Sequence, residues 1–178
     1  MKKLAWRFLF ISTLISVSAG PSSAEDLIVD LGNKFKPVNH LASCSLYGIK
    51  SNTEPTNAMI APTKPSMFVQ MAPNGGQLPN GSPVPLGDIL MAAPIAASHG
   101  AQVTLRMPDV YPTFPYQWVG MNDWLNKVDQ MVSDWLASGN NNLYGYEIWN
   151  EPDYTWNTSA AGNFNDAWKI TYDRIKSI

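Results

Sequence analysis

Short apolar runs, rich in β-branched and aromatic residues, alternate along the chain with longer stretches that mix apolar and polar positions. Runs of this composition, bounded by Gly, Pro, Asn and Ser, are typical of β-strands. They predict four strands, at residues 41–49, 67–71, 101–107 and 143–150.

The stretches between and after these runs place apolar residues at the three- and four-residue spacing of a helix face. Residues 121–138 show this spacing most clearly, and Gly139 follows where a left-handed helix cap is typical. Helices are also predicted at residues 86–99, which contain Pro94, and from about Asn163 onward. Strands separated by helices predict a parallel sheet of right-handed βαβ units.

The two longest connections, residues 72–85 and 108–120, both follow a predicted strand. In (β/α)8 barrels the strand-to-helix loops build the active site, whereas the helix-to-strand loops are short. We therefore predict an α/β fold, the first half of a TIM (β/α)8 barrel with about four β/α units. The chain has 178 residues, while such barrels need roughly 200–250. We thus expect a partial barrel domain at residues 25–178, truncated after the fourth strand and its helix.

The amino terminus has the pattern of a secretory signal. Three basic residues precede an apolar stretch at residues 8–19, and small residues follow. This pattern predicts a signal peptide at residues 1–24, with cleavage after Ala24 or, as the alternative, after Ala19. The apolar stretch is too short to span a hydrocarbon core of about 30 Å. The mature chain is expected to be secreted, extracellular or periplasmic, with no membrane partner.

The charge and the His and Cys content of the chain limit the classes of binding partner that we expect. Without the signal, nine basic and 14 acidic residues remain, and no Lys/Arg cluster is present, which argues against nucleic acid. With two His, no metal site is expected, and we expect no cofactor. The lone Cys44 excludes an intrachain disulfide, and its apolar neighbours predict a buried thiol. A neutral partner is favoured.

One short motif carries candidate chemistry. Residues 146–153 read Tyr-Glu-Ile-Trp-Asn-Glu-Pro-Asp, at the end of the fourth predicted strand. Alternation along a strand predicts that Glu147, Trp149 and Glu151 project to one side. Glu151 then lies at the carboxyl end, where barrel enzymes hold their chemistry. Desolvation against Trp149 would favour the acid form of this carboxyl group, as a general acid requires. Asn150 can bind a substrate hydroxyl.

The segment Trp149-Asn150-Glu151-Pro152 resembles the Asn-Glu-Pro signature of clan A glycoside hydrolases, which are retaining enzymes with an eight-fold β/α barrel. Its flanks are most similar to family 39-like secreted proteins. The likeness covers most of residues 41–178 and is specific in the Asn-Glu-Pro segment. It implies hydrolysis of O-glycosidic bonds in a β-linked polysaccharide or oligosaccharide, with Glu151 as acid/base and Asn150 as ligand of the 2-hydroxyl.

Glu147 lies deeper in the predicted sheet than Glu151, by about 3.3 Å for each of four residues. An unpaired interior carboxylate is costly, and Arg106 ends the third predicted strand. We expect a structural Glu147–Arg106 pair that supports the site. Contact of Arg106 with substrate is the alternative.

Aromatic residues gather in the second half of the chain, with 14 of the 20 at residues 111–172. Aromatic rings suit the flat C–H faces of sugars in partly wet sites. The alternative for these side chains is loop packing, and for Asp109 a turn after Pro108. The predicted substrate contacts, besides Asn150, are Trp118, Trp149, Tyr154, Trp156 and Asp109.

A retaining glycosidase needs a second carboxylate about 5–5.5 Å from the acid/base. The resemblance implies a glutamate on a seventh strand for this role, and no glutamate here matches that position. The fragment alone is therefore expected to be inactive. Two alternatives stay open: a non-catalytic secreted protein that binds a cellulose-like carbohydrate, and an unrelated secreted α/β domain in which Glu151 is incidental.

Overall fold

The computed structural model describes residues 42–78 and 84–178, together with Asp30, Gly32, Lys36 and His40. The chain divides into two compact units, residues 1–37 and 38–178. In the first unit, the amide of Gly32 donates to the carboxylate of Asp30. The predicted signal peptide at residues 1–24 lies outside the described residues.

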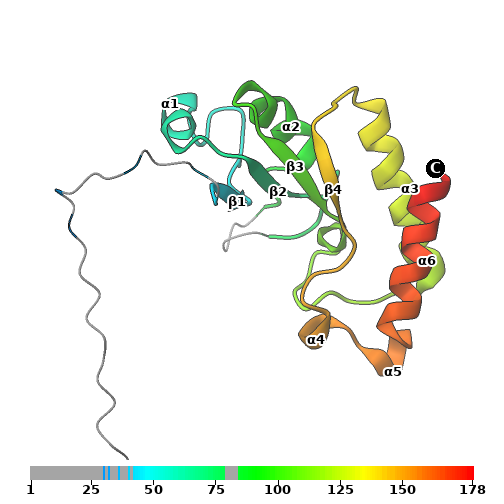
Figure 1. Cartoon of the computed structure of the whole chain (residues 1–178). Coiled ribbons are helices and arrows are strands. Elements are labelled where there is room, and N and C mark those ends of the chain that lie inside the picture. The colour runs from blue at the N-terminus through cyan, green and yellow to red at the C-terminus, as the bar shows by residue number, and fades with distance from the viewer. Residues whose placement is uncertain (1–29, 31, 33–35, 37–39, 41, 79–83) are drawn as a thin grey trace, which may run out of the picture. The chain divides into compact units, whose positions relative to one another are not determined.

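The second unit is a mixed α/β structure around a four-stranded parallel sheet (Figure 1). Its strands lie in sequence order, β1-β2-β3-β4. They are β1 Cys44–Leu46, β2 Met67–Met71, β3 Gln102–Arg106 and β4 Leu143–Glu147. All three neighbouring pairs are parallel. The predicted parallel sheet is therefore confirmed, and β2 has the predicted bounds.

Helices precede or follow each strand. The longer ones are α2 Ile89–Ser98, α3 Met121–Ala137 and α6 Phe164–Ser177, close to the predicted ranges. The short ones are α1 Asn57–Ile60, α4 Pro152–Thr155 and α5 Thr158–Ala161, with 3-10 turns η1 Ala61–Thr63 and η3 Met107–Val110. Helix α2 begins at Ile89 because the Asp88 carboxylate accepts the amides of Leu90 and Met91.

The two faces of the sheet differ in burial. Phe68, Val103 and Leu105 point to one face and are buried in a core shared with α2 and α3. Thr104 and Arg106 point to the other face and are only half-buried. Apolar side chains on the first face therefore hold the helices, while the second face carries polar groups near the carboxyl ends of the strands.

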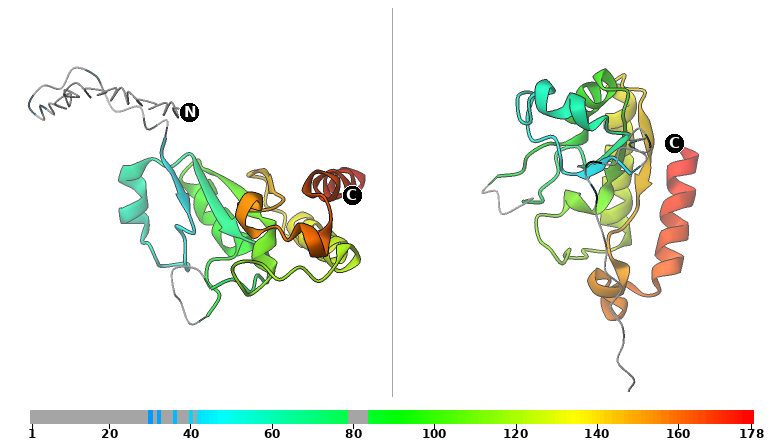
Figure 2. Two further views of the ribbon diagram at one scale, coloured as in Figure 1. Left: turned by 90° about the horizontal axis from the view of Figure 1, so that it is seen from below. Right: turned by 60° about the vertical axis from the view of Figure 1, so that its left-hand side comes forward.

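Helix α6 packs along α3 at the end of the sheet that carries β4 (Figure 2). The indole of Trp124 on α3 donates to the hydroxyl of Thr171 on α6 at 2.7 Å, and both side chains are buried. Arg174 holds Asp129 across the exposed side of the same pair. These contacts fix the segment that follows β4.

The prediction of a buried Cys44 is wrong. The side chain is exposed. Strand β1 is three residues long and lies at the edge of the sheet, where no other strand of the described residues pairs with its outer flank. The apolar neighbours in the sequence therefore do not enclose the thiol.

Candidate functional site

Glu151 lies in the turn that follows β4. The strand ends at Glu147, earlier than predicted, and the backbone of Glu151 is left-handed, with φ 51° and ψ 55°. The alternation expected for Glu147, Trp149 and Glu151 is therefore wrong at Glu151, because the chain has left the strand. The Glu151 side chain is exposed, and among the described residues it has no hydrogen bond or ion pair. It is a free carboxyl group at the carboxyl edge of the sheet.

The main chain around Glu151 is held by Thr155. This buried hydroxyl lies 2.6 Å from the carbonyl oxygen of Asn150 and 3.0 Å from that of Glu151. The same hydroxyl accepts the indole N–H of Trp149 at 2.9 Å. A non-glycine residue in the left-handed region costs about 1 kcal/mol or more, and such strain is concentrated at functional sites. The turn therefore presents Glu151 and the half-buried Asn150 in a fixed arrangement.

Trp149 lies in the core rather than at an open surface. It is 7% exposed, and its ring is surrounded by a group of aromatic side chains, here called the aromatic cluster. The members in ring contact with Trp149 are Tyr111, Tyr116, Trp118, Trp124 and Trp156. The structure thus places the predicted stacking face of Trp149 against protein. Its ring supports the turn that carries Glu151.

The other predicted aromatic contacts lie nearer the surface. The rings of Trp118 and Trp156 meet at a centroid distance of 4.8 Å, and both side chains are half-buried. Trp156 also donates to the carbonyl oxygen of Gly162. Tyr154 is 69% exposed and lies 6.2 Å from the ring of the exposed Phe114. Phe114 and Tyr154 thus form an exposed aromatic pair, and Tyr154 follows Glu151 by three residues in the sequence.

The ion pair expected between Arg106 and Glu147 is present. The Arg106 Nε donates to a Glu147 carboxylate oxygen at 2.9 Å, across directly paired positions of β3 and β4. Both side chains are half-buried. Burial opposes the charge of Arg106, but the neighbouring Glu147 carboxylate outweighs it and raises the pKa of the guanidinium. The pair occupies Glu147, which leaves Glu151 as the free glutamate of the motif.

The prediction that Asp109 offers its carboxylate to substrate is wrong. The side chain is fully buried, and its two oxygens accept the hydroxyls of Tyr47 at 2.7 Å and Tyr116 at 3.1 Å. Its main-chain oxygen accepts the amides of Gly76 and Gln77. Burial raises the pKa of Asp109 to about 6, although both tyrosines and Arg106 act in the opposite direction. Asp109 therefore ties together the segments that follow β1, β2 and β3.

Tyr47 is the residue of this region that the sequence reasoning missed. Its hydroxyl also accepts from Arg106 at 3.4 Å, and the guanidinium lies 5.5 Å from its ring centroid. Burial and the Asp109 carboxylate raise the pKa of the Tyr47 hydroxyl, so it stays protonated. One signal was available, because Tyr47 lies near the end of the first predicted strand, as Arg106 does in the third. Carboxyl ends of parallel strands meet at one edge of a sheet.

Two further properties concern ligands and membranes. Among the described residues, no three His, Cys, Asp or Glu side chains gather closely enough to hold a metal ion. No helix in the described part of the chain has the length and apolar character needed to cross a membrane.

Comparisons with known proteins give one informative likeness. No protein-family model matches the chain, and no curated protein matches it. The chain is similar to a solved structure described as "Structure of N2152 from Neocallimastix frontalis", with 35% sequence identity and a TM-score of 0.68. The match covers 78% of this chain and 34% of the other, so this chain spans about a third of that protein. The likeness supports the α/β fold.

Proposed function

We propose that this chain forms the first half of a (β/α)8 barrel of a secreted, clan A-like glycoside hydrolase. Its reaction is hydrolysis of O-glycosidic bonds in a β-linked polysaccharide or oligosaccharide, with retention of configuration. Glu151 acts as the acid/base, and Asn150 binds the sugar hydroxyl next to the reacting carbon. The observation that carries the proposal is the free carboxyl of Glu151, held in a strained turn at the carboxyl edge of the sheet.

The strand order supports a barrel over a doubly wound sheet. Strands that follow one another in a single direction, joined by right-handed crossovers, place all crossover helices on one face. A doubly wound sheet reverses its strand order and is covered on both faces. Here one face is buried under helices, while Thr104 and Arg106 on the other are only half-buried. A barrel interior closes over that second face.

The free edge of β4 supports a continued sheet. An apolar groove of about 400 Å³ runs between β4 and α6. Tyr144 is 66% exposed there, beside the half-exposed Trp168 and Tyr172. Exposed edge strands are usually covered or shortened, because their unpaired backbone groups invite pairing. A neighbouring strand and helix would bury these side chains.

The chemistry asked of Glu151 is proton transfer. In a retaining mechanism the carboxylic acid protonates the departing glycosidic oxygen, and the resulting carboxylate then takes a proton from the water that attacks the sugar. Glu151 has the exposure that this exchange with substrate and water requires. The second carboxylate, the nucleophile, is assigned to no residue of this chain. We assign Glu147 a structural role instead, because it lies at the end of β4, before the turn, in an ion pair with Arg106.

A non-catalytic carbohydrate-binding protein is the second candidate. The ion pair of Glu147 favours it, because a double displacement needs a second carboxylate as nucleophile and none is assigned in this chain. In this alternative Asn150 and Tyr154 bind sugar, while Glu151 is a hydrogen-bond acceptor. Both candidates share a carbohydrate site in the turn after β4.

Affinity electrophoresis through gels that contain neutral β-linked polysaccharides tests this shared site. We expect at least one of hydroxyethyl-cellulose, xylan, glucomannan and laminarin to retard the wild-type chain. Asn150→Ala should weaken retention roughly tenfold, the effect of losing about 1.4 kcal/mol of hydrogen bonding. Asn141→Ala, which removes an exposed amide before β4, is the matched control. Lack of retention by all four, or an unchanged Asn150 variant, contradicts the proposal.

A further inference from the structure

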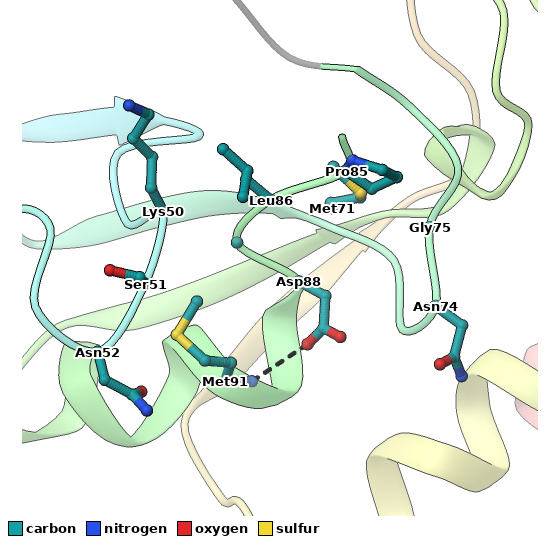
Figure 3. A pocket seen from close by; sticks show the side chains of 11 residues that line it. Lys50, Ser51, Asn52, Met71, Asn74, Gly75, Pro85, Leu86, Asp88 and Met91 are labelled. Atoms are coloured by element: carbon teal, nitrogen blue, oxygen red, sulfur yellow. Dashed lines mark hydrogen bonds between the residues drawn. The ribbon is translucent and has the colours of Figure 1, made fainter. Parts of the chain in front are cut away.

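A cavity of about 400 Å³ lies near the carboxyl ends of β1 and β2 (Figure 3). None of its lining residues belongs to the turn that carries Glu151. We call it the Asp88 pocket. In Figure 3, residues 50–52 and residues 74–75 lie on either side of Asp88. Its polar lining consists of Lys50, Ser51, Asn52, Asn74 and Asp88.

Buried contacts fix the walls of the Asp88 pocket. Gln70 is fully buried on β2, and its amide nitrogen donates to the carbonyl oxygens of Ile49 and Gly87, both at 2.9 Å. Gly87 has φ +73°, and a Cβ at this position would collide with the Ile49 oxygen. The segment after β1 and the segment before α2 are thus clamped to the same strand. The pocket is part of the fold rather than a chance gap between loops.

The polar groups of the pocket offer no unpaired cation and are partly without hydrogen-bond partners among the described residues. Lys50 is paired with Glu54 at 2.9 Å. One Asp88 oxygen accepts two helix amides, and the other has no hydrogen-bond partner among the described residues. The side-chain amides of Asn52 and Asn74 likewise have no partner in the described part of the chain. Free amides and a carboxylate oxygen bind hydroxyl groups, and the lack of a free cation disfavours an anionic ligand.

Apolar side chains complete the pocket. Met71, Leu86 and Met91 line it together with the polar groups. A lining that combines apolar surface with a few polar groups suits a ring that has C–H faces and hydroxyl edges. The chemistry therefore matches a neutral sugar unit.

The distance between the Asp88 pocket and Glu151 determines how long a ligand must be to contact both. Strands β2 and β4 are two positions apart in the sheet, which is about 10 Å at the usual strand spacing. Lys50 follows β1, still further from β4. A single sugar ring is smaller than this separation, whereas a chain of several units spans it.

Resting on the function proposed above, we propose that the Asp88 pocket is a distal subsite for one unit of a neutral, hydroxyl-rich glycan whose chain runs along the carboxyl edge of the sheet to Glu151. The substrate class is then a polysaccharide or long oligosaccharide. Binding depends on chain length, because short fragments fill the turn after β4 without reaching the pocket.

The test compares a long and a short fragment of the polysaccharide that retards the chain in affinity electrophoresis, six and two units, by calorimetric titration. The variant is Asn52→Ala/Asn74→Gly, two exposed positions whose replacement leaves the buried clamp intact. Glycine is used at position 74 because the backbone of Asn74 is left-handed, with φ 53°. Asn141→Ala is the control. We expect roughly tenfold weaker binding of the six-unit fragment, corresponding to about 1.4 kcal/mol. Binding of the two-unit fragment should change less than twofold. Unfolding midpoints of all variants should match wild type.

The outcomes separate this inference from the function on which it rests. If the double variant binds both fragments as wild type does while Asn150→Ala weakens both, the distal subsite is refuted and the site at Glu151 stands. If the double variant weakens both fragments equally and Asn150→Ala weakens neither, the pocket is an independent sugar site, and the proposed function and the extended path both fail. If none of the four polysaccharides binds the chain, the subsite is refuted as well.

Discussion

Asp109 allows a quantitative prediction, because its carboxylate is fully buried between Tyr47 and Tyr116. Replacing it by Asn keeps the shape and removes the charge. Burial raises the pKa of Asp109 from 3.8 to about 6 in the folded chain. The folded state therefore binds this proton more tightly than the unfolded state does. The resulting stability is fully present below about pH 3.8 and is lost as the pH rises through about 6.

The pKa difference corresponds to about 3 kcal/mol, at 1.36 kcal/mol for each pH unit. Most of this change, about 2–3 kcal/mol, falls between pH 4 and pH 7.5. Asp109→Asn cannot titrate in this range. The difference in unfolding free energy between wild type and variant should therefore shift by that amount in favour of wild type as the pH falls.

Urea unfolding followed by tryptophan fluorescence measures this difference at each pH. Asp153→Asn, at an exposed aspartate, is the matched control for the chemical change. Asp109→Ala should lower the unfolding free energy by about 3 kcal/mol at pH 7.5, because the hydroxyls of the half-buried Tyr47 and the buried Tyr116 lose their acceptor. A constant difference between wild type and Asp109→Asn from pH 4 to 7.5 would refute the reasoning.

Three further changes test other parts of the structure by the same unfolding assay. Glu151→Gly should stabilise the chain by up to about 1 kcal/mol, because it relieves the left-handed backbone, while sugar binding weakens; a destabilised variant would argue against strain in the turn. Arg106→Leu should cost about 3 kcal/mol by leaving the Glu147 carboxylate unpaired, and Arg106→Leu/Glu147→Leu should recover most of it. A single variant as stable as wild type would contradict this account. Gly87→Ala should cost at least about 2 kcal/mol, because the methyl group meets the Ile49 oxygen and the backbone is left-handed. A loss below ~0.5 kcal/mol, the range of surface changes, would show that the segment around Gly87 shifts easily and is not clamped.

The sequence allowed the sheet to be predicted where the periodicity was strong. Strand β2 matches its predicted bounds, and α3 ends one residue before the predicted limit. The Arg106–Glu147 pair was predictable because strand ends of neighbouring parallel strands meet, and few partners were available. The strand and the helix were predictable from the local spacing of apolar residues, and the ion pair from the small number of cations available to Glu147.

The errors concern contacts between distant segments. Asp109 was expected among the substrate contacts because it begins the long loop after the third predicted strand, but its burial depends on Tyr47, 62 residues away. Strand β4 ends early because Trp149 turns into the aromatic cluster and Thr155 holds the carbonyl oxygen of Asn150. No local pattern encodes such pairings, so they require the folded chain.

Chemical labelling of Glu151 tests the central claim most directly. An epoxyalkyl glycoside of the bound sugar places its epoxide just beyond the glycosidic oxygen, where a carboxylate can open the ring and form an ester. We predict one label per chain on Glu151 by mass spectrometry, lost in Glu151→Gln and prevented by excess unlabelled oligosaccharide. Labelling at other carboxylates, or equal labelling by an epoxide that carries no sugar, would contradict a role for Glu151 beside the scissile bond.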